Sequence, residues 1–221
     1  MTGIHLGIIG GGQLGSMLAS AAKKLNIKTI VYCDDRNAPA QNFSDDFICG
    51  NYQDFEKIKE FTNKSDLVTF EFENIPFGTL KKINELKQVF PNPEINKIIQ
   101  NRLTEKDFVN KLNIKTTKYK LIKNNEDLKK SLDLLPGFLK TSTLGYDGKG
   151  QLKINSKKNL DNLKIDFKKE YILEKLVNLK KEISVIITRF GNQKYEIYEP
   201  IENKHEEQIL TYSKIPAEIN K

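Results

Sequence analysis

The strongest constraint on the fold is a strand, a glycine-rich turn and a helix that follow one another at the start of the chain. An apolar run over residues 4–9 leads into the turn, and an amphipathic stretch over residues 13–25 leaves it. Gly10, Gly12 and Gly15 have the G-x-G-x-x-G spacing that is typical of dinucleotide-binding turns. The pattern predicts a parallel α/β unit, and a cofactor at the turn is one interpretation of it.

A second apolar run, residues 29–32, and the carboxylates after it complete this pattern. Asp34 and Asp35 lie about 20 residues beyond the glycines, where an acidic side chain can hold a ribose hydroxyl. However, every parallel sheet needs a connection from strand to helix, and glycine allows a tight turn whatever lies above it. A cofactor site and a purely structural turn therefore both stay open on this motif alone.

The alternation of strand and helix patterns continues to about residue 100. Helical periodicity marks residues 55–61 and 78–87, and an apolar strand pattern lies between them at residues 67–72. Such alternation predicts a parallel sheet with helices on both faces, and ligands of these sheets gather at the carboxyl ends of the strands. We expect the glycine turn and the E-F-E-N segment, residues 71–74, at that edge.

The character of the sequence changes after a helix that is predicted over residues 101–113. Thr104 is the expected N-cap of this helix, and Asp107 occupies the capping-box position. Short strand patterns then follow with few helices between them, and one of these strands is expected over residues 181–189. We therefore predict an α/β domain over residues 1–103 and an α+β domain over residues 104–221.

Composition excludes several classes of protein. No run approaches the roughly 20 apolar residues of a membrane span, so we expect a cytoplasmic protein with no membrane partner. The net charge of +7 comes mainly from lysines scattered among acidic residues, which is not typical of a nucleic-acid-binding surface. Cys33 and Cys49 lack the spacing of a zinc site or a disulfide framework, and small buried side chains are expected instead.

A second glycine-rich segment, residues 137–154, is predicted to be a strand, a loop and another strand. Phosphate loops of the P-loop or dinucleotide type lead into a helix, so this loop differs from both. Gly145, Gly148 and Gly150 would let it close as a flap, with backbone N–H groups on phosphate oxygens and Lys140 as a point charge. An ordinary hairpin with a polar tip is the alternative.

Two carboxylates further along the chain could belong to the same site. Glu174 lies near the end of an apolar strand pattern, and Glu182 lies near the start of another. Carboxylates at strand ends can accept hydrogen bonds from ribose hydroxyls, and the apolar residues between them could enclose a purine. The pattern indicates a nucleotide held between two sheets, although both side chains could also face solvent as alternate residues of a strand.

A family resemblance becomes specific because six segments occur in a fixed order. They are IGGGQLGSML, VTFEFENIP, NRLTEKDF, LKTSTLGYDGKGQ, ILEKLV with KEISVI, and IENKHEEQILTYSKIPAEI. Over nearly all of its length the chain resembles the 5-(carboxyamino)imidazole ribonucleotide synthase family of ATP-grasp enzymes. The resemblance implies a Rossmann-like pre-ATP-grasp domain followed by an ATP-grasp domain that is incomplete at its C-terminus. It also implies that the first glycine turn faces a phosphoribosyl substrate and binds no dinucleotide.

The resemblance also implies residues for binding and catalysis. The implied ATP-binding residues are Arg102, Lys140, Gly145, Tyr146, Asp147, Gly148, Lys149, Gly150, Gln151, Glu174, Lys175, Leu176, Val177, Glu182 and His205. The implied substrate-binding residues are Gly12, Gln13, Leu14, Glu73 and Asn74. Catalysis would fall on Tyr146, Asp147 and Lys149, and Lys149 stands where the family often has arginine. Lysine lacks the bidentate fork with which arginine would hold bicarbonate or carboxyphosphate. His5 is expected to be structural.

The implied reaction is phosphorylation of bicarbonate by ATP, followed by attack of the amine of 5-aminoimidazole ribonucleotide. Carboxyphosphate hydrolyses readily, so a lid that excludes water would serve this chemistry. The resemblance places the magnesium ligands beyond Lys221 and none within the chain, and it implies a homodimer. We expect this chain alone to be inactive or nearly so.

Three alternatives remain at this stage. The first is another ATP-grasp ligase, such as a formate-using glycinamide ribonucleotide transformylase, which would share the architecture. The second is a nicotinamide-binding dehydrogenase, which depends on the first glycine turn alone. The third is a noncatalytic scaffold or regulatory fragment that holds a ligand without turning it over.

Overall fold

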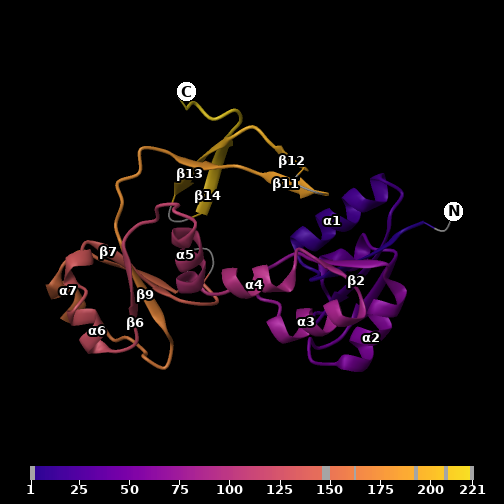
Figure 1. The fold of residues 1–221 in the computed structure, drawn as a ribbon, viewed down its shortest axis with the longest axis horizontal. Coiled ribbons are helices and arrows are strands. Elements are labelled where there is room, and N and C mark those ends of the chain that lie inside the picture. Colours follow the sequence, from indigo (N-terminus) through magenta and orange to yellow (C-terminus); the bar gives the residue numbers. More distant parts are fainter. Residues whose placement is uncertain (1–2, 146–149, 162, 192–193, 207–208, 220–221) are drawn as a thin grey trace. The chain divides into compact units, whose positions relative to one another are not determined.

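The computed structural model describes residues 3–145, 150–161, 163–191, 194–206 and 209–219 (Figure 1). The chain divides into two compact units, Met1–Asn113 and Ile114–Lys221, and each is described by itself below. The domain boundary at residue 103 stays a prediction.

The first unit contains a five-stranded parallel sheet with strand order β3-β2-β1-β4-β5. Its strands are β1 (His5–Ile9), β2 (Lys28–Cys33), β3 (Asp46–Cys49), β4 (Leu67–Phe70) and β5 (Val89–Phe90). The parallel sheet that the alternating pattern predicts is thus confirmed. Because all five strands run in the same direction, the turns that follow β1 and β4 lie at the same edge of the sheet.

Helices cover both faces of this sheet, as Figure 1 shows for α1 on one side of β2 and for α2 and α3 on the other. Ile8 of β1 packs with Ala19 of α1, whereas the next residue, Ile9, packs with Phe61 of α2 in the core on the opposite face. Buried side chains on both faces therefore fix the strand that leads into the glycine turn. The helices are α1 (Gln13–Lys24), the 3-10 helix η1 (Pro39–Asn42), α2 (Phe55–Lys64), α3 (Phe77–Leu86), α4 (Pro93–Ile99) and α5 (Arg102–Lys111).

The start of α5 differs from the prediction. Asn101 is the N-cap, and its side chain accepts hydrogen bonds from the amides of Leu103 at 2.8 Å and Thr104 at 3.4 Å. Thr104, the predicted N-cap, lies inside the helix and donates its hydroxyl to the carbonyls of Ile98 and Asn101. The prediction was wrong because two capping residue types occur three positions apart, and asparagine is the stronger cap of the two.

The second unit contains a four-stranded antiparallel sheet with strand order β6-β9-β7-β8. Leu139 and Leu173 of this sheet form a core with Leu128 of α6 and Leu160 of α7, and Figure 1 shows both helices on the same side. The connection from β7 to β8 confirms that the second glycine-rich segment joins two strands. The elements are β6 (Tyr119–Ile122), α6 (Asn125–Lys129), the 3-10 helix η2 (Leu132–Leu134), β7 (Gly137–Thr141), β8 (Gln151–Ile154), α7 (Lys157–Asp161) and β9 (Tyr171–Lys175).

Five further strands of the second unit form two smaller antiparallel sheets. In the first sheet β10 (Glu182–Ser184), β13 (Ile201–Glu206) and β14 (Ile209–Lys214) lie in the order β10-β13-β14, and in the second β11 (Ile187–Phe190) pairs with β12 (Lys194–Ile197). The single strand predicted over residues 181–189 is therefore wrong. An apolar run indicates extended backbone, but it does not show where the chain leaves one sheet for another.

Candidate functional site

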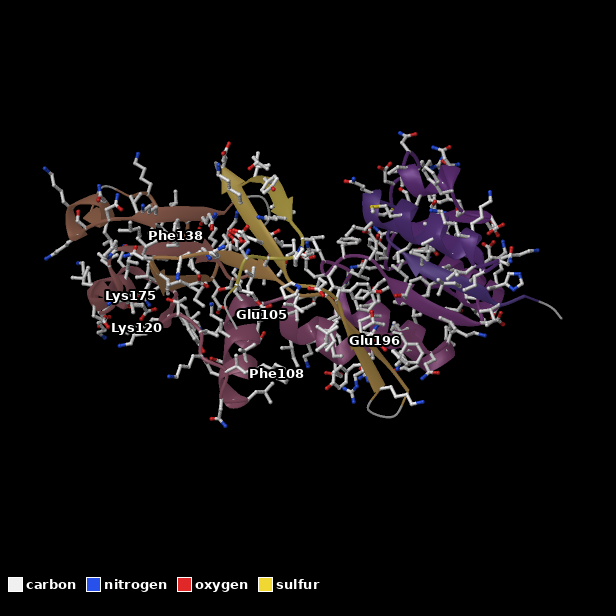
Figure 2. The ribbon with its side chains drawn as sticks, turned by 90° about the horizontal axis from the view of Figure 1, so that it is seen from above. Glu105, Phe108, Lys120, Phe138, Lys175 and Glu196 are labelled. Atoms are coloured by element: carbon white, nitrogen blue, oxygen red, sulfur yellow. The ribbon has the colours of Figure 1, made fainter. Side chains whose placement is uncertain are left out.

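One face of the β6-β9-β7-β8 sheet carries a largely buried ion pair. The Nζ atom of Lys140 lies 2.8 Å from Oε2 of Glu174, and the two side chains are only 23% and 10% exposed. Phe138, labelled in Figure 2, lies opposite Glu174, and the centroid of its ring is 5.8 Å from the Lys140 ammonium. Leu139 and Leu173 alternate with these residues and pack into the core on the other face.

This arrangement holds a cation at a fixed place beside the strand. Lysine presents a compact point charge that suits phosphate oxygens. The partial shielding from water strengthens its electrostatic interactions relative to an exposed lysine. An incoming phosphate would compete with Glu174 for the ammonium of Lys140.

The glycine-rich flap begins and ends beside this ion pair. Lys140 of β7 lies opposite Gln151 of β8, and the Thr141 amide donates a 2.8 Å hydrogen bond to the carbonyl of Gly150. Gly150 has a φ of +76°, and a Cβ atom there would lie 2.7 Å from Oγ1 of Thr141, so the position requires glycine. Gly145 is the last residue described before the gap in the flap. The predicted site residues Tyr146, Asp147, Gly148 and Lys149 lie outside the described residues.

The residues after Glu174 continue the hydrogen bonding of β9 with both of its neighbours, β6 and β7. The Lys175 amide donates to the carbonyl of Lys118 at 2.8 Å, and the Leu176 amide donates to the carbonyl of Pro136 at 2.9 Å. The Leu176 amide is therefore used within the protein. Val177 follows it and is 52% exposed.

Two further predicted residues, Glu182 and His205, meet in a pocket of the β10-β13-β14 sheet. Nδ1 of His205 lies 3.2 Å from Oε2 of Glu182. Nζ of Lys181 lies 2.8 Å from Oε2 of Glu202, and this hydrogen bond lowers the pKa of the Glu202 carboxyl. All four side chains line a pocket of about 400 Å³. Carboxylates in such a pocket can accept hydrogen bonds from sugar hydroxyls.

The predicted ATP-binding residues thus form separate local groups. Lys140 pairs with Glu174 on one sheet, and His205 pairs with Glu182 on another sheet of the second unit. Arg102 is the first residue of α5 and belongs to the first unit. A single nucleotide site that includes all of them stays a proposal.

The carboxylate of Glu71, the residue directly after β4, lies in the first glycine turn. The Gly12 amide donates to Oε1 of Glu71 at 3.1 Å. Gly10 has a φ of +104°, and a Cβ atom there would lie 2.4 Å from Cγ of Glu71. A Cβ atom at Gly15 would lie 2.5 Å from the carbonyl oxygen of Gly10. Gly10 and Gly15 are therefore required by contacts within the protein, and a Cβ atom at Gly12 would lie 3.1 Å from Oε1 of Glu71. The spacing of the three glycines does not depend on a bound dinucleotide.

The remaining predicted substrate residues lie at the same edge of the parallel sheet. Gln13 and Leu14 begin α1 and are exposed. Glu73 and Asn74 follow β4, and the side-chain amide of Asn74 donates to Oε1 of Glu73 at 3.3 Å. Polar and apolar side chains are thus available where ligands of parallel sheets bind.

Two residues that sequence reasoning missed hold the Glu73–Ile75 segment from α4 and its end. The buried side chain of Asn96 donates to the carbonyls of Glu73 at 3.1 Å and Ile75 at 3.3 Å. Gln100 donates to the same two carbonyls at 2.6 Å each. These four bonds hold the backbone of the segment, and Glu73 is exposed. No local pattern signals this role, since Asn96 and Gln100 look like ordinary polar helix residues.

The described part of the chain contains neither a cluster of metal ligands nor a membrane-spanning helix. Within it, no group of three or more histidine, cysteine, aspartate or glutamate side chains could hold a metal ion. No helix of that part is long and apolar enough to cross a bilayer. Cys33 and Cys49 are free thiols, and burial raises the pKa of the Cys33 thiol, which makes it a weaker nucleophile at neutral pH.

Family models and a curated relative match almost the whole chain. A ribonucleotide synthetase preATP-grasp domain matches residues 2–100, and an ATP-grasp domain matches residues 107–221. The N5-carboxyaminoimidazole ribonucleotide synthase of Staphylococcus aureus (strain COL) is 36% identical over 222 residues. The aligned region covers 99% of this chain and 59% of that protein, so the chain spans about three fifths of the relative's length.

Two crystal structures have a similar fold. One is N5-carboxyaminoimidazole synthetase from Staphylococcus aureus complexed with ADP, with a TM-score of 0.93, 35% identity, and coverage of 99% of this chain and 59% of that one. The other is N5-carboxyaminoimidazole synthase from Aspergillus clavatus in complex with ADP and 5-aminoimidazole ribonucleotide, with a TM-score of 0.85, 26% identity, and coverage of 99% and 58%.

These matches confirm the family resemblance and the predicted fold class, which is a pre-ATP-grasp domain followed by an ATP-grasp domain. The glycine spacing that also suggested a dehydrogenase is explained by Glu71 at Gly10 and Gly12, and by the carbonyl of Gly10 at Gly15. The ATP-grasp match alone extends over residues 107–221, which is more than half of this chain, so the chain belongs to the ATP-grasp family.

Proposed function

We propose that the protein carrying this chain carboxylates 5-aminoimidazole ribonucleotide with bicarbonate and ATP, which gives 5-(carboxyamino)imidazole ribonucleotide in de novo purine biosynthesis. The names of the relatives and the ADP and 5-aminoimidazole ribonucleotide bound in two of their structures support this assignment. The observation in this chain that carries it is the Lys140–Glu174 pair at the base of the glycine-rich flap.

The proposed ATP site combines the residue groups of the second unit. Lys140 would neutralise phosphate charge, and the flap from Gly145 to Gln151 would close its backbone N–H groups over the phosphates. Glu174 and the backbone near Leu176 and Val177 would contact the adenine. Glu182 would accept hydrogen bonds from the ribose hydroxyls, and His205, which pairs with Glu182, would hold that carboxylate in place. We propose that Lys175 and Arg102 also bind the nucleotide.

The proposed chemistry proceeds in two steps. An oxygen of bicarbonate attacks the terminal phosphorus of ATP, the bond to the bridging oxygen breaks, and ADP leaves with carboxyphosphate as the product. The amine of 5-aminoimidazole ribonucleotide then attacks the carboxyl carbon, phosphate leaves, and the nitrogen loses a proton. We assign catalytic roles to Tyr146, Asp147 and Lys149 of the flap, whose closure would exclude water from the mixed anhydride.

The ribonucleotide would lie at the carboxyl edge of the parallel sheet. Gly12, Gln13 and Leu14 at the glycine turn, together with Glu73 and Asn74, are the residues that we propose for its binding. The bonds from Asn96 and Gln100 support this assignment because they fix the segment that carries Glu73 and Asn74.

Magnesium, when bound to the triphosphate, would neutralise phosphate charge and orient the terminal phosphoryl group. We assign none of the described residues to the ion, because that part of the chain holds no cluster of three suitable ligands. We further propose that the protein works in the cytoplasm as a homodimer, which sedimentation of the purified protein would test.

Calorimetric titration of the chain with ADP tests the nucleotide site. We expect Lys140→Ala to weaken ADP binding at least about tenfold, since an ammonium–phosphate contact contributes roughly 1.5–3 kcal/mol. Lys130→Ala is the matched control, because Lys130 is 69% exposed and pairs only at the surface with Glu126. Equal ADP affinity in the two variants, or absence of binding to the unsubstituted chain, would contradict the assignment.

Turnover is tested on a protein that extends to the length of the relatives. Phosphate release should require both bicarbonate and 5-aminoimidazole ribonucleotide. Formate with glycinamide ribonucleotide should not replace them. Activity with formate would favour the transformylase instead, and oxidation of NADH with an added substrate would favour a dehydrogenase.

A further inference from the structure

Glu71 supplies a hydrogen-bond acceptor and a negative charge at the N-terminus of α1, where the helix has neither of its own. The N-cap of this helix is Gly12, which has no side chain to accept a hydrogen bond, and the first turn contains no acidic residue. A helix N-terminus has unpaired N–H groups and a partial positive charge, and both favour an anion. The carboxylate of Glu71, 59 residues further along the chain, accepts the Gly12 N–H at 3.1 Å and places a negative charge there.

The position of this carboxylate is fixed by its surroundings. The Glu71 amide donates to the carbonyl of Ile9 at 3.0 Å, which continues the pairing of β1 with β4. The side chain then crosses the turn, where a Cβ atom at Gly10 would lie 2.8 Å from its Oε1 and one at Gly12 would lie 3.1 Å from the same oxygen. Two glycines of the fingerprint therefore make room for the same internal carboxylate.

We propose that Glu71 is a specificity-determining residue that keeps phosphate groups out of the glycine turn. In a dinucleotide-binding turn the pyrophosphate lies at the helix N-terminus, where the Glu71 carboxylate lies in this protein. A ligand at this edge meets a hydrogen-bond acceptor, so it presents donors such as sugar hydroxyls or an amine and directs its phosphate elsewhere. The identity of that ligand rests on the proposed function, whereas the exclusion of phosphate does not.

The size of the effect follows from the repulsion between two anions. An opposite charge within about 4–6 Å lowers the pKa of a carboxyl by roughly 1–3 units, and a like charge acts in the opposite direction. On that scale the effect of one nearby charge is a tenfold to thousandfold change in an equilibrium constant. Removal of the Glu71 charge should therefore strengthen phosphate binding at the turn at least about tenfold. Glu71→Gln keeps the shape and an acceptor for the Gly12 amide, whereas Glu71→Ala also empties the position.

Titration of the ¹⁵N-labelled chain with inorganic phosphate tests the proposal through the amide signals of Gly10, Gly11 and Gly12. We expect no saturable shift of these signals in the unsubstituted chain and a saturable shift in Glu71→Ala, with Glu71→Gln between them. Glu85→Gln, an exposed position on α3, removes the same charge elsewhere and should behave as the unsubstituted chain. The same spectra report whether each variant is folded.

Two results would overturn the proposal. One is phosphate binding at Gly12 that is equally tight with and without Glu71, and the other is the absence of binding in both Glu71 variants while their spectra remain folded. Titration with ADP, followed at the amides beside Lys140, tests the proposed nucleotide site separately from the exclusion of phosphate by Glu71. Loss of ADP binding there would contradict the nucleotide site and leave the result for Glu71 unaffected.

Discussion

Gly15 shows at the scale of a single residue how closely α1 approaches the turn before it. A Cβ atom at this position would lie 2.5 Å from the backbone oxygen of Gly10, and backbone cannot move aside as a flexible side chain can. We expect Gly15→Ala to lower the free energy of unfolding by about 1–3 kcal/mol, as overpacking does. Urea unfolding measures the change.

Gly78 of α3 is the matched control for that substitution. A Cβ atom there would meet nothing within 4 Å, so Gly78→Ala, at the second residue of α3, should raise the free energy of unfolding by at most about 0.5 kcal/mol through helix propensity. Equal unfolding midpoints for the two variants would show that the close approach at Gly15 has no energetic weight.

Tyr32 gives the stability a dependence on alkaline pH. Its hydroxyl donates to the carbonyl of Asn51 at 2.6 Å, and burial raises the pKa of the phenol to about 12. The unfolded chain releases this proton near pH 10, so the folded state binds it more tightly. The contribution is therefore present below pH 10 and lost as the pH rises from 10 to 12.

Comparison of two tyrosine variants isolates this contribution. The unsubstituted chain and Tyr32→Phe should both lose unfolding free energy between pH 10 and 12. The loss in Tyr32→Phe should be smaller than the loss in the unsubstituted chain by on the order of 2 kcal/mol. Tyr195→Phe, at a side chain that is 59% exposed, should follow the unsubstituted chain. Parallel pH profiles for all three proteins would contradict the assignment to Tyr32.

At the scale of secondary-structure elements, the start of α5 depends on one side chain. Asn101 accepts hydrogen bonds from the Leu103 and Thr104 amides, which would otherwise lack a partner within the helix. We expect Asn101→Ala to lower the free energy of unfolding by about 1 kcal/mol and to speed exchange of these two amides. Asn101→Ser keeps a capping oxygen, so it should lower the free energy of unfolding by only a few tenths of a kcal/mol. A decrease as large as that of Asn101→Ala would show that capping is not the cause.

The elements also show what periodicity can and cannot predict. The parallel strands and helices of the first unit follow from alternating apolar patterns, because burial on both faces of a sheet requires them. The cap of α5 and the break between β10 and β11 do not follow, because each is decided by a choice among neighbouring residues of similar type. Val185 and Ile186, which separate those strands, are as apolar as the strands themselves.

At the scale of the whole molecule, each unit has a core of its own. Phe61 and Leu80 belong to the core of the first unit, and Leu139 and Leu173 belong to that of the second. If ADP binds at Lys140, a concentration of about 100 times its dissociation constant should stabilise the second unit by about 2.7 kcal/mol. Amide hydrogen exchange should then slow at Leu139 and Leu173 and stay unchanged at Phe61 and Leu80; equal slowing of both cores would contradict the location.

Much of the candidate site could be predicted because its residues lie in motifs that keep their order along the chain. Lys140 and Glu174 are examples, since each lies in a segment that can be recognised alone. The roles of Glu71, Asn96 and Gln100 could not be predicted in this way. Each acts through a contact with backbone that is distant in the sequence, and spacing within a motif does not report such contacts.

The carboxylate that crosses the first turn has a practical consequence for anyone who sorts or redesigns proteins of this kind. A glycine fingerprint indicates that space is open beside the backbone, but it does not show which group fills that space. In this protein the Glu71 side chain fills that space. A redesign that aims to bind NAD at this turn would therefore have to replace Glu71 before it changes any glycine.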